Sequence, residues 1–220
     1  MRKSFLILLT LVVMSFGAKA QLIKDRTNGQ LTLGFDLYTD INTGAAYENF
    51  NLRGINQGFG TYLTYNFPMG ESKHTVSLGM GVSCHNYYIK SAWLSEPYNH
   101  EITFTEASVD KSKINFNYLD IPLEVNFRIV DKFKISFGAK VSFLMTCKSK
   151  VIGDVYDDGH KWEIKYGSVN ACENIIYSVF ARMGYRCVNL FVGYQINSSF
   201  KQNRGPEIMP FSIGIGIRAY

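Results

Sequence analysis

The sequence contains no apolar run of the length that a membrane-spanning helix requires. Its longest run, Phe5 to Phe16, has twelve residues, whereas a spanning helix needs about 20. No long stretch repeats apolar residues every three to four positions, so amphipathic helices are not predicted either. Any passage through a membrane would therefore be made by β-strands. The composition agrees, with 16 Phe, 14 Tyr and 19 Gly, many of them inside alternating runs.

Cysteine is scarce, and its four positions follow no zinc-ligand spacing. Cys147 and Cys172 would lie near the same end of two neighbouring strands. A disulfide that staples a loop is one interpretation of this pair, and two free thiols are the other. Cys84 and Cys187 are interpreted as small membrane-facing or turn residues.

Histidine is equally scarce, which limits the catalytic chemistry on offer. None of the four, His74, His85, His100 and His160, stands in a recognised catalytic spacing. His85 follows Ser83 on one face of a strand, where polar lining is the ordinary role. The aspartates at 154, 157 and 158 lack the twelve-residue calcium loop. The sequence thus predicts no cofactor, no metal and no enzymatic activity.

The first twenty residues have the features of a secretory signal. A basic start, Met1-Arg2-Lys3, precedes the apolar run, and Ala18-Lys19-Ala20 supplies a small-x-small cleavage pattern before Gln21. We therefore expect residues 1–20 to be cleaved and residues 21–220 to form one domain. Loss of Arg2, Lys3 and Lys19 lowers the net charge from +5 to +2, and no nucleic-acid partner is predicted.

Residues 117–143 show the clearest pattern in the chain. From Leu119 to Ile129 apolar and polar residues alternate, Val130-Asp131-Lys132 makes a tight reversal, and alternation resumes from Phe133 to Phe143. This period of two predicts a hairpin whose strands have one apolar and one polar face. Taking alternation as the guide, eight strands are predicted, at 30–39, 58–67, 75–85, 119–129, 133–143, 175–186, 189–200 and 211–220.

The connections between these strands alternate between short and long. The short ones are 68–74, 130–132 and 187–188, and the long ones are 40–57, 86–116, 148–174 and 201–210. Outer-membrane barrels have short periplasmic turns and longer extracellular loops. The predicted fold is therefore all-β, an eight-stranded antiparallel up-and-down transmembrane β-barrel in the bacterial outer membrane, with both termini in the periplasm and lipid on its apolar face.

The polar faces of the predicted strands carry charges of both signs. They are expected to point into the lumen, which eight strands leave just wide enough for side chains to fill. An ion-paired plug is favoured over an ion pathway, because lone charges there are costly. The predicted network consists of Asp36, Asp120, Glu124, Arg128, Lys134, Lys140, Arg182, Arg186 and Arg218.

Two further details are predicted from single residues. Pro122 cannot donate to a ladder and is interpreted as marking a β-bulge. Residues 100–105 and 161–166 look extended, so some strands should continue above the membrane. Four aromatic residues in the long links would belong to an aromatic girdle at the membrane surface or, alternatively, to a surface patch: Trp93, Tyr98, Trp162 and Tyr166.

Two stretches of the chain resemble a known family. The strand Tyr118-Leu119-Asp120-Ile121-Pro122-Leu123 and the ending Phe211 to Tyr220, with its Gly-x-Gly alternation and terminal aromatic, are similar to the PorT-like outer-membrane β-barrels of Bacteroidetes. The resemblance implies insertion by the barrel-assembly machinery, which reads the last strand. It also implies partners in the envelope or in protein secretion, the task of the founding member. Ala219 departs from the family, where a bulkier residue is usual before the final aromatic.

Three functions follow from these observations. The first is a structural or interaction barrel whose loops contact proteins, surface glycans or a secretion assembly. The second is a narrow porin-like channel or transport component. The third is a small lipid-modifying enzyme that would use His85.

Overall fold

A computed structural model describes residues 31–45, 47, 50–130 and 132–219. The predicted signal segment, residues 1–20, and Tyr220 lie outside these described residues. Within the described part of the chain, no helix has the length and apolarity needed to cross a membrane.

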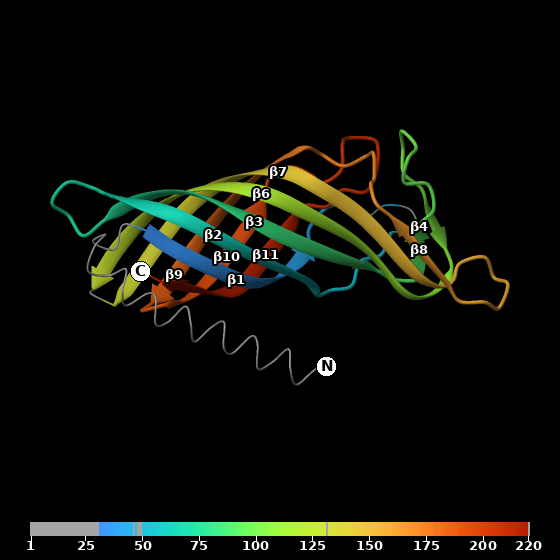
Figure 1. The fold of residues 1–220 in the computed structure, drawn as a ribbon, viewed down its shortest axis with the longest axis horizontal. Helices are drawn as coiled ribbons and strands as arrows, with labels where there is room; N and C mark the ends of the chain where they lie inside the picture. The colour runs from blue at the N-terminus through green and yellow to red at the C-terminus, as the bar shows by residue number, and fades with distance from the viewer. Residues whose placement is uncertain (1–30, 46, 48–49, 131, 220) are drawn as a thin grey trace.

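Eight antiparallel strands form a closed barrel, as predicted (Figure 1). Each pairs with the next along the chain, β1 pairs with β11, and the β6–β7 pairing completes the ring. The strands are β1 (Leu31–Asn42), β2 (Asn56–Pro68), β3 (Thr75–Ile89), β6 (Ser108–Val130), β7 (Phe133–Asp154), β9 (Ile175–Tyr185), β10 (Val188–Gln195) and β11 (Pro210–Ala219). Short turns and long loops alternate around the ring as the sequence indicated.

Strand lengths differ from the prediction mainly at one end of the barrel. β6 and β7 have 23 and 22 residues and continue as a hairpin beyond the other strands (Figure 1). β8 (Trp162–Tyr166) pairs with the end of β7, and β4 (Ala92–Leu94) pairs with β5 (Phe104–Glu106). β10 ends at Gln195 rather than at the predicted Phe200.

The polarity of the two strand faces reverses along the barrel. On β6, the outward residues between Leu119 and Ile129 are apolar and exposed or, at Val125, half-buried, while the inward residues Asp120 and Glu124 are buried. Toward the long loops, the outward residues of β6 become Asn117, Asn115, Lys113 and Lys111, and the inward ones become Tyr118, Phe116 and Ile114. We call the part with the apolar outside the membrane zone and the part with the polar outside the extracellular zone. Lipid suits the first surface and water the second.

The extracellular zone has a hydrophobic core of its own, which closes one end of the barrel. Side chains from the ends of β3 and β6 pack there against residues of the long loops, including Phe50, Ile102 and Phe200. This extracellular core consists of Phe50, Tyr87, Ile89, Ala92, Leu94, Ile102, Phe104, Ile114, Phe116, Tyr118, Cys147, Val169, Ala171, Cys172, Ile176, Phe200 and Ile208. Loops that cover a barrel end in this way are fixed by burial rather than left free in water.

A β-bulge in β7 sets which residues enter this core. Asn117 pairs with Thr146 but Tyr118 pairs with Leu144, so Met145 is an extra residue on β7. Because side chains alternate between faces, the extra residue shifts the inward positions from even to odd numbers. Cys147, Ser149 and Val151 are consequently buried, whereas uninterrupted alternation would place them outside.

Pro122 does not mark a bulge, contrary to the prediction. It pairs with Lys140 of β7 in regular register. On its other side, Leu78 pairs with Leu123 and Gly81 with Asp120, so the register is also kept. The two pairs between them are missing from the ladder, since Pro122 has no N–H to donate. The sheet accommodates the proline by losing ladder pairing rather than by inserting a residue.

Candidate functional site

The centre of the lumen is an ion-paired network that joins four strands. Arg182 of β9 donates to both carboxylate oxygens of Asp36 of β1, at 2.9 and 2.7 Å. Its Nε lies 3.7 Å from Glu124 of β6, which accepts a 3.1 Å hydrogen bond from Arg218 of β11. All four side chains are buried. A bidentate arginine–carboxylate pair is the strongest ion-pair geometry available, and here it ties opposite sides of the ring together.

A second ion pair lies beside this network. Lys140 donates to Oδ2 of Asp120 at 3.0 Å, and the Tyr62 hydroxyl donates to the same oxygen at 3.0 Å. The Lys140 ammonium also lies 5.8 Å from the centre of the Tyr62 ring. The lumen thus carries its charges as partnered groups, which is the condition under which buried charge is tolerated.

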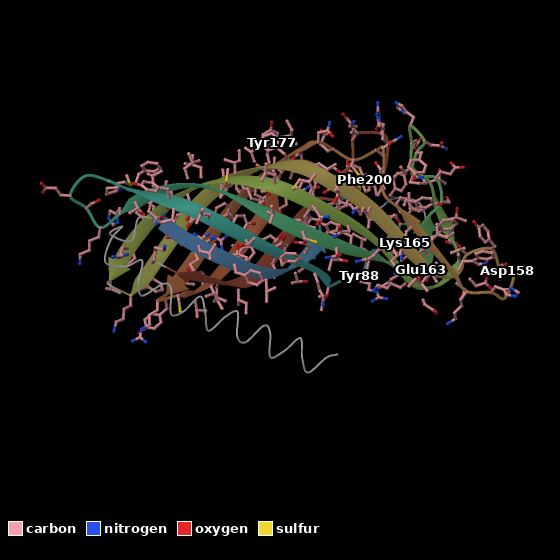
Figure 2. The ribbon with its side chains drawn as sticks, viewed as in Figure 1. Tyr88, Asp158, Glu163, Lys165, Tyr177 and Phe200 are labelled. Atoms are coloured by element: carbon pink, nitrogen blue, oxygen red, sulfur yellow. A yellow bond between two sulfur atoms is a disulfide. The ribbon has the colours of Figure 1, made fainter. Side chains whose placement is uncertain are left out.

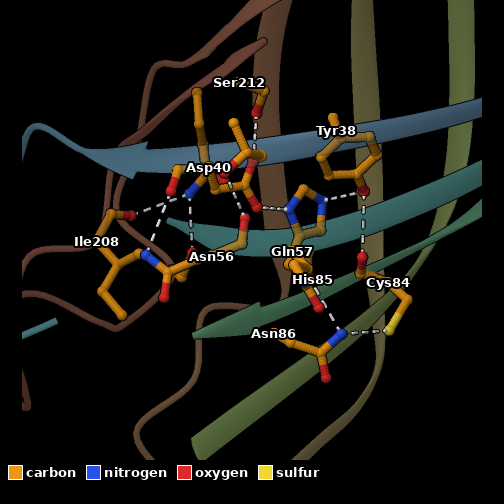
Figure 3. A network of polar contacts seen from close by, with 12 residues as sticks. Tyr38, Asp40, Asn56, Gln57, Cys84, His85, Asn86, Ile208 and Ser212 are labelled. Atoms are coloured by element: carbon orange, nitrogen blue, oxygen red, sulfur yellow. Dashed lines mark hydrogen bonds and ion pairs between the residues drawn. The ribbon is translucent and has the colours of Figure 1, made fainter. Parts of the chain in front are cut away.

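A third cluster contains a histidine and lies toward the extracellular zone (Figure 3). Nδ1 of His85 is 2.6 Å from Asp40, and Nε2 is 3.1 Å from the Tyr38 hydroxyl. Ser212 donates to the other oxygen of Asp40 at 2.5 Å. A Cβ at position 58 would overlap the Tyr38 ring, so Gly58 makes room for this ring. His85 was predicted on the inner face, but its partner Asp40 was not, because the predicted first strand ended at Thr39.

Neutral groups fill the periplasmic end of the lumen. Asn66 donates to Thr32 at 2.7 Å, Ser77 to Asn66 at 2.5 Å, Asn126 to Ser77 at 2.6 Å and Ser136 to Asn126 at 2.7 Å. These side chains are buried and come from five different strands of the ring. The chain of hydrogen bonds therefore crosses much of the barrel.

The other three residues of the predicted network lie nearer the periplasmic turns. Arg128 is exposed near the end of β6, and Lys134 is half-buried opposite it on β7. Arg186 lies in the β9–β10 turn, is exposed, and has its guanidinium 5.7 Å from the Tyr185 ring. Arg186 is thus not a lumen residue: alternation placed it inside, but β9 ends at Tyr185 and position 186 has a positive φ of 53°.

The motif Tyr118 to Leu123 spans the reversal of polarity. Its residues Tyr118, Asp120 and Pro122 are buried, whereas Leu119, Ile121 and Leu123 are exposed on the apolar outer face. The Tyr118 ring stacks on Phe116 of the extracellular core at 6.1 Å and meets His85 edge-on at 5.8 Å. This motif therefore joins the polar lumen to the apolar core above it.

The space left in the lumen is small. A cavity of about 50 Å³ lies among the three charged clusters, with Tyr38, Tyr62, His85 and Arg182 in its wall. Ser212 bonds to Asp40 and not to His85, so these residues do not form a serine–histidine–acid arrangement, in which the base receives the serine proton. Among the residues that the structure describes, no group of three or more His, Cys, Asp or Glu side chains is arranged to hold a metal ion.

A disulfide fastens the extracellular core. Cys147 of β7 is bonded to Cys172 in the loop that leads to β9, with the Cα atoms 6.9 Å apart. Cys172 also forms an isolated bridge with Phe200 in the next loop. Of the two free cysteines, Cys84 is half-buried on the outer face of β3, and Cys187 is exposed in the β9–β10 turn.

The aromatic residues of the long links do not form a girdle. Tyr156 meets Trp93 and Trp162 edge-on at 6.3 and 5.7 Å, and Tyr98 meets Tyr166 at 5.8 Å. Trp162 is paired with Gly153, eight residues beyond the bulge at Met145. The expected girdle is therefore corrected to an aromatic group at the far end of the hairpin, in which Trp93 is buried while Tyr98 and Trp162 are exposed.

Comparisons with solved structures return small outer-membrane barrels. Neisserial surface protein A is 14% identical, with 87% of this chain and 97% of that chain covered and a TM-score of 0.45. Ail, the attachment invasion locus protein of Yersinia pestis, in complex with the heparin analogue sucrose octasulfate, is 15% identical, with 86% and 96% covered and a TM-score of 0.35. No curated protein matches the sequence.

The family comparison covers most of the chain. The model of the outer membrane protein beta-barrel domain matches residues 19–205. This range contains seven of the eight barrel strands, from β1 to β10. The chain therefore belongs to the outer membrane protein beta-barrel domain family and is an outer-membrane β-barrel protein.

Proposed function

We propose that this protein is a non-conducting barrel that acts as a structural or interaction component through its extracellular surface. The observation that carries the proposal is the closure of the barrel at two levels. Paired charges fill the lumen, and the extracellular core covers one end.

The filled lumen argues against the alternative of a narrow channel. The four central side chains are 1% to 7% exposed and bond to one another across the ring: Asp36, Glu124, Arg182 and Arg218. A solute would have to separate these pairs, and leaving one such charge unpaired costs roughly 3–5 kcal/mol. The cavity of about 50 Å³ has room for a few water molecules and for little else.

The extracellular core supports a binding role for the loops. Four long loops meet in it, and the Cys147–Cys172 bond joins one of them to β7. A surface held in one conformation loses little entropy when a partner binds, so such loops are suited to a specific contact. A lipid-modifying enzyme is disfavoured, since both ring nitrogens of His85 are occupied by Asp40 and Tyr38.

The partners we propose are those that the PorT-like resemblance implies. The motif Tyr118 to Leu123 and the ending Phe211 to Tyr220 support a role in protein secretion or surface assembly, and insertion by the barrel-assembly machinery. Photo-crosslinkers placed in living cells at exposed loop positions such as Tyr98 and Tyr156, with a periplasmic position such as Lys132 as the control, test this. Envelope or secretion proteins captured only from the loop positions are the expected result.

Planar-bilayer recording tests the closed lumen. We expect the wild-type protein to give no steady conductance. As a positive control, Glu124→Ala with Arg182→Ala and shortened loops 43–55 and 155–174 should conduct, because the pairs and the cover are both removed. Folding of each protein is checked by its change in gel mobility on boiling. Steady wild-type conductance would refute the proposal and support the channel.

A further inference from the structure

A row of lysines crosses the outer face of the extracellular zone. In register, Tyr88 of β3 is opposite Lys113 of β6, Lys113 is opposite Lys150 of β7, and Lys150 is opposite Lys165 of β8. Side chains directly opposite each other on one sheet face are about 5 Å apart at Cβ, and like charges there are destabilising. Three ammonium groups in consecutive register positions are thus an arrangement that folding alone does not favour.

The acids nearby offset only part of this charge. Glu163 accepts from Lys150 at 2.6 Å and from Lys165 at 2.8 Å, and these two bonds lower its pKa to about 2. Asp110 is bound to Lys161 at 2.7 Å. Lys113 donates to the neutral Asn86 at 3.1 Å. Partial burial and, after it, the nearby Lys111 ammonium lower the pKa of Lys113.

Further cations surround the row. Lys111 and Arg53 lie 6.0 and 5.3 Å from the Tyr88 ring, beside a shallow hollow of about 340 Å³ that these three residues help to line. Lys148, exposed on β7, lies on the membrane side of Lys150. Figure 2 shows Lys165 and Glu163 on the same flank of the molecule as Tyr88.

The height of this surface above the lipid indicates its ligand. Met145 ends the continuous apolar outer face of β7 and is 59% exposed. At a rise of about 3.3 Å per residue and a tilt of about 45°, Lys148 lies about 7 Å and Lys150 about 12 Å above it. Headgroups of an ordinary bilayer extend about 5–7 Å beyond the hydrocarbon. Lys148 therefore lies at the top of the headgroup layer, and Lys150 of the lysine row lies about 5 Å above it, within reach of phosphates carried on a sugar headgroup.

We propose that Lys113, Lys150 and Lys165, with Tyr88, Arg53 and Lys111 beside them, bind the phosphorylated sugar headgroup of a glycolipid in the outer leaflet. The ammonium groups pair with the phosphates, and the Tyr88 ring and its hollow accommodate part of the sugar. Bound lipid would supply the anions that the lysine row lacks. This site depends on the membrane zone and is independent of the protein partners proposed above.

The test compares two triple variants in nanodiscs. The row variant removes the three lysines of the row and carries Lys113→Gln, Lys150→Gln and Lys165→Gln. The control variant removes the same number of positive charges at the periplasmic turns and carries Lys73→Gln, Lys132→Gln and Arg186→Gln. The probes are diphosphorylated lipid A, its dephosphorylated form and phosphatidylglycerol, with binding read by native mass spectrometry and by the shift in unfolding temperature.

We expect wild type and control to bind diphosphorylated lipid A alike, and the row variant to bind at least about tenfold more weakly, since each lysine near a lipid surface contributes to binding. Dephosphorylated lipid A and phosphatidylglycerol should give no such difference. Equal binding by the row variant would overturn the proposal. So would equally tight binding of soluble inositol hexakisphosphate, which would identify the surface as a site for soluble polyanions. Gel mobility on boiling confirms that each variant is folded.

Discussion

At the scale of single residues, Arg182 holds more of the lumen together than any other side chain described above. It bonds twice to Asp36, lies 3.7 Å from Glu124, and has the Phe191 ring 4.8 Å from its guanidinium carbon. Because it serves two carboxylates, its loss leaves two buried acids with fewer partners. Buried pairs are a weak source of net stability, but breaking one of them is costly.

Arg182→Ala is therefore expected to lower the free energy of unfolding by about 3–5 kcal/mol. Urea titration of the protein in lipid vesicles, followed by tryptophan fluorescence, measures the change. Arg128→Ala removes the same type of side chain at an exposed position and should change stability by less than about 0.5 kcal/mol. Adding Asp36→Ala to Arg182→Ala should recover part of the loss, and strict additivity would contradict the pairing.

The lumen network was predictable from sequence as far as alternation holds. Five of the predicted residues lie in the interiors of strands, where alternation decides which face a side chain is on: Asp36, Asp120, Glu124, Lys140 and Arg182. Arg218, one residue before the end of β11, also lies on the inner face that alternation predicts. Arg186 and Asp40 lie near strand ends. Alternation assigns such residues to a face correctly only if the end of the strand is also predicted correctly. The bonds that select Asp40 as the partner of His85 join β1 to β3 across the lumen, and no local pattern contains them.

At the scale of elements, the bulge at Met145 and the Cys147–Cys172 bond act together. The bulge turns Cys147 inward, and the bond then fastens the loop before β9 to the extracellular core. Alternation alone could not predict this, since one extra residue reverses every position that follows it. Pro122 illustrates the opposite case, because a residue typical of bulges is accommodated here in regular register.

Cys147→Ser with Cys172→Ser is expected to destabilise the extracellular core while the barrel stays closed. The bond closes a segment of 25 residues, for which the loss of chain entropy corresponds to about 3.5 kcal/mol. Hydrogen exchange should therefore increase in residues 168–174 and remain slow in β1 and β11. Cys84→Ser with Cys187→Ser, which alters only the free cysteines, is the control. Unchanged exchange at 168–174 would show that packing alone fixes the loop.

The edge strand β8 is expected to respond to acid. Lys150 and Lys165 lower the pKa of Glu163 to about 2, so its carboxylate stays ionised at a lower pH than an ordinary glutamate. A carboxyl with a depressed pKa stabilises the fold above its unfolded value, near 4.3, and this contribution is lost as the pH falls toward about 2. Exchange protection of β8, corrected for intrinsic rates, should therefore decrease from pH 5 to pH 2. Glu163→Gln should abolish this pH dependence, and a variant that keeps it would assign the effect to another group.

At the scale of the whole molecule, the reversal of polarity along β6 and β7 determines where the membrane lies. On β6 the outward residues change from Leu119 to Asn117, and on β7 from Met145 to Thr146 and Lys148. The upper boundary can be read from the sequence for β6, where alternation is unbroken. In β7 the boundary could not be predicted from the sequence, because the bulge interrupts the alternation. The strand β8 belongs wholly to the extracellular zone. The closed ring was predictable because each strand pairs with its sequence neighbour.

A scan of arginine substitutions by depth tests this placement. Leu123 lies midway along the apolar outer face of β6 and is 50% exposed, and Ile129 lies at its periplasmic end and is 59% exposed. Leu123→Arg should lower the free energy of unfolding in vesicles by about 2–4 kcal/mol, and Ile129→Arg by about 0–1 kcal/mol, because the cost of a charge falls toward the membrane surface. Leu123→Ala controls for the loss of side-chain contacts. Leu123 and Ile129 are similarly exposed, so the two arginine variants would be equally stable if water surrounded the barrel. A larger loss of stability for Leu123→Arg than for Ile129→Arg is expected only if lipid does.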